Sequence, residues 1–115
     1  MMQVLMKDMG YKSEHAAGSP ADELLKKLVK DKSDDVKFWA CLSLGRIGDQ
    51  EFLPILKEVL ATDKSRYVRG AAAEAIAMIG GAKSIPILNE AIETNKAYYQ
   101  VKTFIAAALG FVGAT

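Results

Sequence analysis

Apolar and small residues recur along the chain with the spacing of one face of an α-helix. The same series of intervals occurs within residues 36–47, 68–79 and 101–112. A stripe with this period is typical of an amphipathic helix that buries one face. We therefore predict three helices of similar length, with these inward positions: Val36, Ala40, Ser43, Leu44 and Ile47; Val68, Ala72, Ala75, Ile76 and Ile79; Val101, Ile105, Ala108, Leu109 and Val112.

A shorter second helix is predicted after each of the first two stripes, at about residues 51–61 and 83–93. Pro54 and Pro86 lie near the start of these segments, where a missing amide hydrogen costs little. Gly48, Gly80 and Gly113 follow the three stripes. Each is expected to end its helix in the left-handed conformation that glycine adopts readily.

The whole pattern repeats about every thirty-two residues. Asp31-Lys32-Ser33 returns as Asp63-Lys64-Ser65 and, more weakly, as Asn95-Lys96-Ala97. Pro54-Ile55-Leu56 returns as Pro86-Ile87-Leu88. A period of this length is typical of stacked supersecondary units that share a continuous core. We predict an all-α fold, a short right-handed α-solenoid of about three and a half helix pairs.

The repeats divide the chain into four parts of one domain, 1–115. Residues 1–30 form an atypical N-terminal cap repeat, 31–61 and 62–93 are full repeats, and 94–115 is a terminal half repeat. In the cap, Ser19-Pro20 should begin a helix that runs to about Lys30. A short helix is predicted before it from the spacing of Met2, Leu5, Met6 and Met9.

Two positions of the long helices hold small residues in every copy. They are Cys41, Ala73 and Ala106 at the first position, and Gly45, Ala77 and Gly110 at the second. Small side chains let neighbouring helices approach closely, so both positions are expected to face another long helix. Cys41 is then a small buried residue. Trp39 is expected to have a packing role because Ala71 and Phe104 occupy its position in the other copies.

The second full repeat resembles the HEAT-like repeats of the family first named from phycobilisome lyases, which form armadillo-like α-solenoids. The matching features are Asp63, Val68-Arg69, Ala71-Ala72-Ala73, Ile79-Gly80 and Ile87-Leu88. The resemblance covers about residues 31–113. It implies the solenoid fold, and it is compatible with scaffolds, with lyase subunits and with a few enzymes.

Composition argues against catalysis. The net charge is +1, and the chain has one histidine, His15, and one cysteine. His15 lies in a predicted loop and is expected to be solvated. No His–Cys or Ser–His pairing beyond this histidine is available, and no metal site or cofactor motif is recognised, so we expect no enzyme activity, metal or cofactor. A single cysteine and no apolar run of about 20 residues favour a cytoplasmic protein that does not enter the membrane.

Basic residues recur in the turns between repeats and at the start of the long helices. Stacked turns would gather them into a ridge that could bind nucleic acid or another anion. The alternative, which we favour, is a structural one, in which the cation after each Val ties to an acid of a neighbouring turn. The basic ridge consists of Lys32, Lys37, Lys64, Arg66, Arg69, Lys96 and Lys102.

The short helices should line the concave side of the solenoid. Their outward residues change from basic to acidic along the stack, a gradient that could orient a polar partner. The candidate residues of this concave face are Lys26, Lys27, Lys57, Glu58, Asn89 and Glu90.

The last helix is apolar where the earlier copies are polar. Phe111 takes the position of Arg46, and Ala107 takes that of Glu74. Ends of solenoids need a polar surface for solubility, so an apolar end marks an interface or a fragment. We therefore expect a non-catalytic protein-binding scaffold with a protein partner of unknown identity, homodimeric through Phe104, Ala107 and Phe111. A nucleic-acid binder is the alternative, and a lyase-like enzyme subunit is a weaker one.

Overall fold

Long and short helices alternate along the part of the chain that the structure describes. The structure is a computed structural model, and it describes residues 19–114. The helices are α2 (Pro20–Leu28), α3 (Asp34–Ile47), α4 (Leu53–Thr62), α5 (Arg66–Gly80), α6 (Ile85–Thr94) and α7 (Tyr99–Ala114). Short 3₁₀ turns, η1 (Gln50–Phe52) and η2 (Gly81–Ser84), precede α4 and α6. No strand occurs within these residues, which confirms the all-α prediction.

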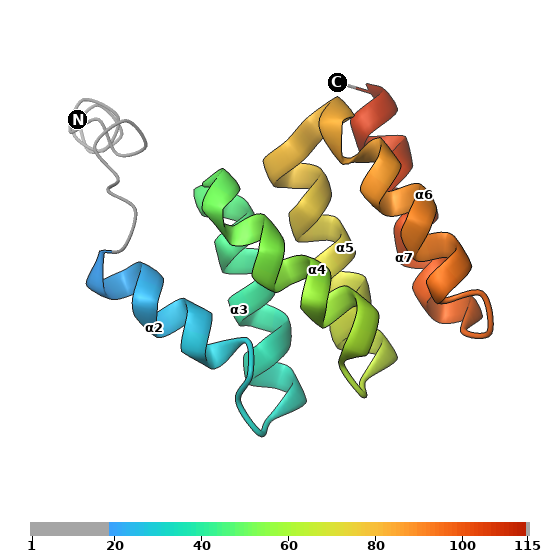
Figure 1. Cartoon of the computed structure of the whole chain (residues 1–115). Coiled ribbons are helices and arrows are strands. Elements are labelled where there is room, and N and C mark those ends of the chain that lie inside the picture. Colours follow the sequence, from blue (N-terminus) through green and yellow to red (C-terminus); the bar gives the residue numbers. More distant parts are fainter. Residues whose placement is uncertain (1–18, 115) are drawn as a thin grey trace.

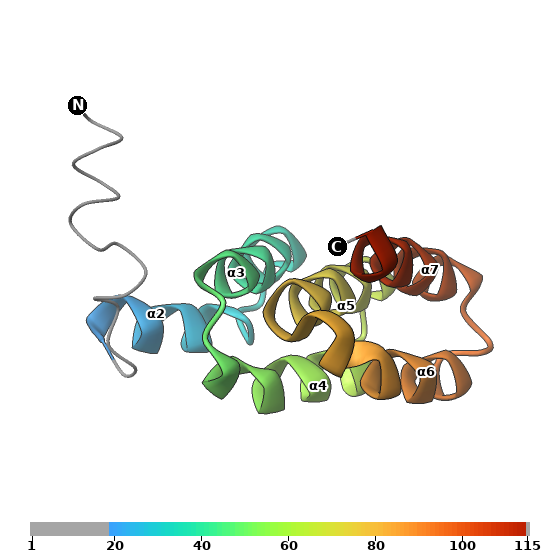
Figure 2. The same ribbon diagram turned by 90° about the horizontal axis from the view of Figure 1, so that it is seen from above.

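The helices form two layers. The long helices α3, α5 and α7 lie side by side in one layer, and the short helices α2, α4 and α6 lie in the other (Figures 1 and 2). Each short helix is connected to the next long helix by a turn at one edge of the stack (Figure 1). The architecture is the predicted short solenoid, and α7 lies at one end of the layer of long helices.

The inter-repeat turns use the same local structure twice. The hydroxyl of Ser33 accepts the amide hydrogen of Val36 at 3.3 Å, and that of Ser65 accepts the amide hydrogen of Val68 at 3.2 Å. An aspartate two residues before each serine accepts the serine's own amide hydrogen. These bonds satisfy donors that a helix start leaves unpaired, which explains why the Asp-x-Ser sequence recurs.

The ends of the long helices differ from one another. Gly48 has a φ of 81° and ends α3 as predicted. The prediction for the second copy was wrong by one residue, because Gly80 is the last residue of α5 and Gly81 takes the positive φ of 53°. Gly113 does not end α7 either, since that helix continues to Ala114.

Most of the predicted apolar stripe lies in the core, whereas Val36, Ser43, Ile47 and Leu109 are partly exposed. Val68, Ala72, Ala75 and Ile76 of α5 are fully buried, and Ile79 is 8% exposed. The small residues also lie where the long helices meet, since a Cβ atom added to Gly45 would come within 2.8 Å of the Cα atom of Ala75. Close packing of the long helices therefore depends on the absence of a side chain at Gly45.

Cys41 lies in the same contact layer and is completely buried. Burial raises the pKa of its thiol to about 12. The thiol therefore stays protonated near neutral pH, and Cys41 acts as a small packing residue, as the sequence predicted.

One continuous helical stretch, residues 66–94, is long and apolar enough to cross a membrane by length and composition alone. Half of its most apolar window is buried inside the protein. The stretch also consists of two helices, α5 and α6, which are separated by η2 and run in opposite directions (Figure 1). Each is shorter than the roughly 20 residues that a membrane span requires, so the apolar surface of this stretch serves the core.

Two expectations from the first forty residues have different outcomes. The helix begun by Ser19 and Pro20 forms as predicted, and the Ser19 hydroxyl accepts the amide hydrogen of Asp22 at 3.2 Å. Trp39 does not take the predicted packing role, because its side chain is 57% exposed on the outer flank of α3. The predicted helix around Met2 to Met9 and the loop with His15 lie outside the described residues.

Candidate interaction surfaces

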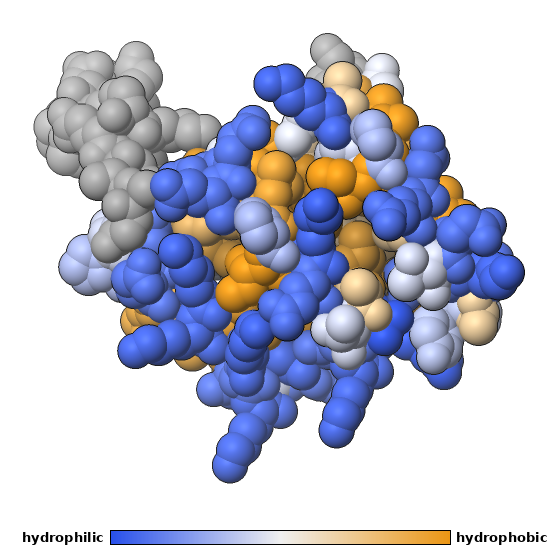
Figure 3. Space-filling view, viewed as in Figure 1, coloured by the Kyte–Doolittle hydropathy of each residue, from blue (hydrophilic) through white to orange (hydrophobic). Residues whose placement is uncertain are grey.

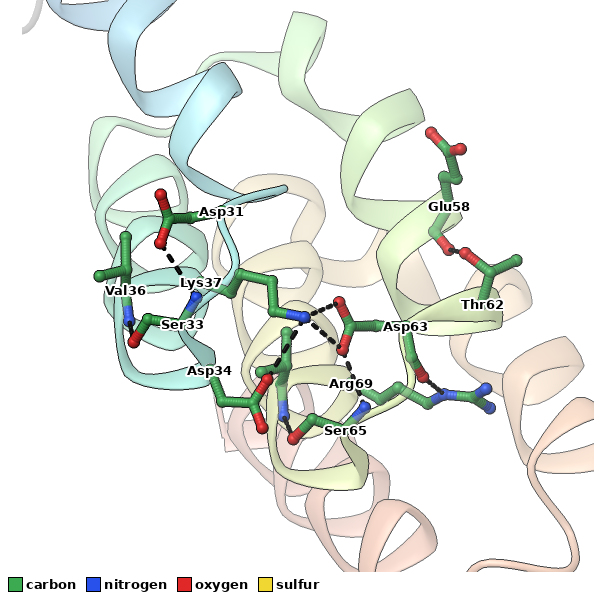
Figure 4. A network of polar contacts seen from close by, with 11 residues as sticks. Asp31, Ser33, Asp34, Val36, Lys37, Glu58, Thr62, Asp63, Ser65 and Arg69 are labelled. Carbon is green, nitrogen blue, oxygen red and sulfur yellow. Dashed lines mark hydrogen bonds and ion pairs between the residues drawn. The ribbon is translucent and has the colours of Figure 1, made fainter.

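Lys37 of α3 binds the turn that precedes α5. Its Nζ atom lies 2.9 and 3.2 Å from the two carboxylate oxygens of Asp63 and 3.3 Å from Oδ1 of Asp34 (Figure 4). The side chains of Lys37 and Asp63 are only 13% and 10% exposed. The hydrogen bond to Asp63 raises the pKa of Lys37, although burial of the ammonium opposes this shift. Lys37 thus ties one repeat to the next.

Arg69 makes the equivalent connection one repeat later. Its Nη1 atom donates to Oδ1 of Asn95 at 2.6 Å, and its Nε atom donates to the main-chain oxygen of Asp63 at 2.6 Å. Asn95 is fully buried, and its amide group donates to the carbonyl oxygen of Ala91 at 3.0 Å. The Lys37–Asp63 and Arg69–Asn95 bonds both span 26 residues. We call this series of inter-repeat bonds the polar ladder.

The polar ladder is open at both ends of the described chain. Lys102 occupies the position of Lys37 and Arg69, but its ammonium has no hydrogen bond or ion pair with any residue of 19–114. At the other end, the carboxylate of Asp31 accepts the amide hydrogen of Ser33, yet it pairs with no cation among residues 19–114. The position 26 residues before Asp31 holds Leu5.

The remaining residues of the basic ridge lie at the surface. Lys32, Lys64 and Lys96 are exposed. The guanidinium of Arg66 lies 4.4 Å from the ring centre of Tyr98. The Nζ atom of Lys96 lies 3.8 Å from Oε1 of Glu93. The polar depression between the first two turns mixes both charges, since its lining includes Lys30, Lys32, Lys37, Lys64, Asp31, Asp34, Glu58 and Asp63. The ridge is therefore divided between structural cations and exposed ones.

The six predicted concave-face residues lie at the surface of the short helices. Lys27, Lys57, Glu58, Asn89 and Glu90 are exposed, and Lys26 is partly exposed. This side of the molecule is mostly hydrophilic, with apolar residues visible in the hollows between side chains (Figure 3). One hollow of about 130 Å³ lies between α4 and α6 and has Leu60, Ile87 and Ala91 in its lining.

The three predicted self-association residues share the side of α7 that faces α5. Phe104 is half-buried and points back to α5, where a Cβ atom added to Gly70 would overlap its ring. Ala107 and Phe111 are exposed, but they line a shallow apolar groove with Met78 of α5. The structure therefore places all three at the junction of α5 and α7.

The open side of α7 carries smaller residues. Thr103, Ala106 and Gly110 are exposed, whereas the residues at the same positions of α3 (Phe38, Cys41 and Gly45) and of α5 (Gly70, Ala73 and Ala77) are buried. A Cβ atom added to Gly110 would find no atom within 4 Å. We call Thr103, Ala106 and Gly110 the open face of α7. The interface was predicted from apolar residues at positions that are polar in the earlier copies, and this face of small residues does not show that signal.

The opposite end of the layer has a larger apolar surface. Trp39 and Leu24 are 57% and 56% exposed. Trp39 lines a groove between α2 and α3 together with Leu25, Leu28, Val36 and Ala40. A row of aromatic rings extends from Trp39 along the long helices. The ring centroid of Phe38 lies 5.2 Å from that of Trp39 and 4.3 Å from that of Tyr67, on which Phe38 stacks. The ring centroids of Tyr67 and Phe104 are 6.4 Å apart. Sequence reasoning assigned no function to this surface.

Chemistry-bearing clusters are scarce in the described part of the chain. No group of three or more His, Cys, Asp or Glu side chains within it could hold a metal ion. The repeated turn, the layer of long helices and the polar ladder instead describe a repeat protein. A family model for HEAT repeats matches residues 21–113. The chain belongs to the HEAT-repeat family.

Comparison of this HEAT-repeat chain with curated proteins gives no match, and neither does comparison with solved structures. HEAT repeats commonly mediate protein–protein interaction and typically act as non-catalytic scaffolds. Membership of this family therefore favours a function in binding, and the exposed ends of the stack are candidate binding surfaces.

Proposed function

We propose that this HEAT-repeat chain is a non-catalytic protein-binding module that associates with a second copy of itself through α7. The observation that carries the proposal is the open face of α7. In α3 and α5 the same positions are buried in the contact with the next long helix. In α7 these positions are exposed and hold the small or medium residues Thr103, Ala106 and Gly110.

The composition of α7 supports this role. Residues 103–115 contain no Asp, Glu, Lys or Arg. Terminal repeats of solenoids usually have a polar outer surface, and contiguous apolar surface on a soluble protein marks an interaction site. Phe111, in the groove between α5 and α7, adds half-exposed aromatic area to the same end of the molecule. A second copy could bury a standard interface of roughly 1,600 Å² there.

A carboxylate on the open face should prevent this association. We expect Ala106→Glu to yield monomers under conditions in which the wild-type chain forms larger species, because the charge would be desolvated in the contact. Light scattering coupled to size exclusion measures the effect. Ala61→Glu places the same side chain on the exposed surface of α4 and should leave the assembly unchanged. A wild-type chain that stays monomeric at every concentration would contradict the proposal.

The exposed lysines of the basic ridge support a second candidate, a nucleic-acid or anion binder. Lys32, Lys64 and Lys96 recur at one position of three successive turns. We rank this function lower because Lys37 and Arg69 are engaged in the polar ladder and because Asp31, Asp34 and Asp63 lie among the lysines. A lyase-like enzyme subunit has no supporting residue cluster in the described chain.

Filter binding to mixed-sequence DNA and RNA at low salt distinguishes the two candidates. We expect no binding stronger than micromolar and no difference between the wild-type chain and a triple variant in which Lys32, Lys64 and Lys96 are neutralised. Binding that disappears in the triple variant and weakens with salt, with a log–log slope near one per phosphate contacted, would favour the nucleic-acid candidate.

A further inference from the structure

We propose that the copies associate head to tail, so that α7 of one copy packs against α3 of the next and Lys102 pairs with Asp31 across the contact. This inference rests on the proposed self-association and specifies its polarity and its register. In such an assembly the layer of long helices continues from one copy into the next, as it does from α3 to α5 and from α5 to α7 within the chain.

The polar ladder sets the register. Within the chain, the cation of each long helix binds the acid or amide of the turn that precedes the next long helix: Lys37 binds Asp63, and Arg69 binds Asn95. The next long helix after α7 would therefore bring a turn residue of the same kind to Lys102. The turn before α3 ends at Ser33 and carries Asp31, whose carboxylate has no cation within residues 19–114. The two open ends are complementary in charge and in position.

The surfaces of the helices are complementary in the same register. Inside the chain, Gly70 makes room for Phe104, and Gly45 lies against the backbone at Ala75. The equivalent pairs between copies are Thr103 with Trp39 and Gly110 with Ser43. In each case a small or medium residue of the open face of α7 meets the residue on the exposed flank of α3. Trp39 would then take the place that Phe104 takes against α5.

The receiving end has an apolar groove that could take part in this contact. Trp39, Leu25, Leu28, Val36 and Ala40 line the groove beside α3. Asp35 also lines this groove, whereas the first two turns of α7 carry a cation, Lys102, and no acid. Charge complementarity between two ends of one chain favours a second copy over a partner of other chemistry, because it fixes orientation as well as attraction.

Such a contact joins two different surfaces, so a pair of copies still exposes one open face of α7 and one α3 flank. Heterologous contacts continue until a ring closes or a filament grows. We therefore expect the average mass in solution to rise past that of a dimer as concentration increases. An isologous contact between two α7 helices would stop at two copies.

Charge reversal at the two ends provides the test, using the full 115-residue chain and sedimentation velocity. Lys102→Glu and Asp31→Lys should each weaken assembly about tenfold or more, because like charges then face each other in the contact. In an equimolar mixture of the two variants, every contact between unlike copies again joins opposite charges. The mixture should therefore assemble like the wild-type chain.

Circular dichroism and a milder variant serve as controls that the variants remain folded. Asp31→Asn retains an oxygen for the amide hydrogen of Ser33, and Asn95 shows that this position tolerates an amide. This variant should remain folded and weaken assembly less than Asp31→Lys. Loss of assembly in Lys102→Glu or Ala106→Glu with no effect of Asp31→Lys would overturn the head-to-tail arrangement and leave self-association through α7 standing. A monomeric wild-type chain, including one whose own residues 1–18 occupy the groove beside α3, would overturn both.

Discussion

Gly45→Ala is expected to destabilise the fold by about 1–2 kcal/mol, although alanine is the better helix former. The added Cβ atom would lie 2.8 Å from the Cα atom of Ala75, a backbone atom that can move only if α3 and α5 separate. Overpacking of this kind costs about 1–3 kcal/mol, which exceeds the roughly 0.5–1 kcal/mol that alanine contributes in a helix interior. Urea denaturation followed by circular dichroism measures the difference in unfolding free energy.

Gly110→Ala is the matched control, because Gly110 holds the same position in α7. The added Cβ atom would find no atom within 4 Å, so only the helix preference remains. This variant should be more stable than the wild-type chain by about 0.5–1 kcal/mol when both are measured at a dilution that keeps them monomeric. Effects of equal sign at the two glycines would contradict the facing of the long helices described above.

Asp63→Ala is expected to cost about 2–3 kcal/mol of unfolding free energy. The variant removes both hydrogen bonds that Lys37 makes to Asp63 and leaves an ammonium that is only 13% exposed with Asp34 as its remaining partner. Loss of the partner of a mostly buried charge costs more than an ordinary hydrogen bond. Asp31→Ala breaks the same turn bond but no cation contact, so it should cost only about 0.5–1.5 kcal/mol.

The pH dependence of the unfolding free energy tests whether the Lys37–Asp63 pair causes the loss of stability in Asp63→Ala. The pKa of Lys37 is raised above its ordinary value of 10.5 in the folded chain, chiefly by the hydrogen bond to Asp63. Its contribution is therefore complete below pH 10.5 and is lost as the pH rises through the folded pKa. The stability difference between the wild-type chain and Asp63→Ala should shrink in that alkaline range. A difference that persists there unchanged would assign the effect to the turn rather than to Lys37.

The sequence predicts the fold well because the same pattern of apolar and polar residues occurs in three successive copies. The apolar stripe of α5 is buried throughout, and Ser19, Ser33 and Ser65 cap their helices. The position of helix ends was less predictable, because a Gly-Gly pair offers two residues that can take a positive φ. At Gly80 and Gly81 the second residue takes it, and the 3₁₀ turn before α6 follows.

The surfaces were harder to predict because side chains reach across repeats. Phe104 was expected at an interface, but Gly70 leaves space for its ring against α5. Trp39 was expected to pack, yet no long helix of the described chain lies on its flank, and it stays 57% exposed. The equivalence of Lys102 with Lys37 and Arg69 was visible in the sequence, but the 26-residue span of the two ladder bonds is seen only in the structure.

The most direct test of the account is a cross-link across the contact between α7 and α3 of two copies. In a Cys41→Ala background, one chain carries Thr103→Cys and the other carries Trp39→Cys. These positions correspond to Gly70 and Phe104, which meet inside the chain, so the Cβ atoms should approach the roughly 3.5–4.5 Å that a disulfide requires. Mild oxidation of the mixture should link unlike chains. Disulfides formed only between two Thr103→Cys chains, or none in a folded mixture, would contradict it.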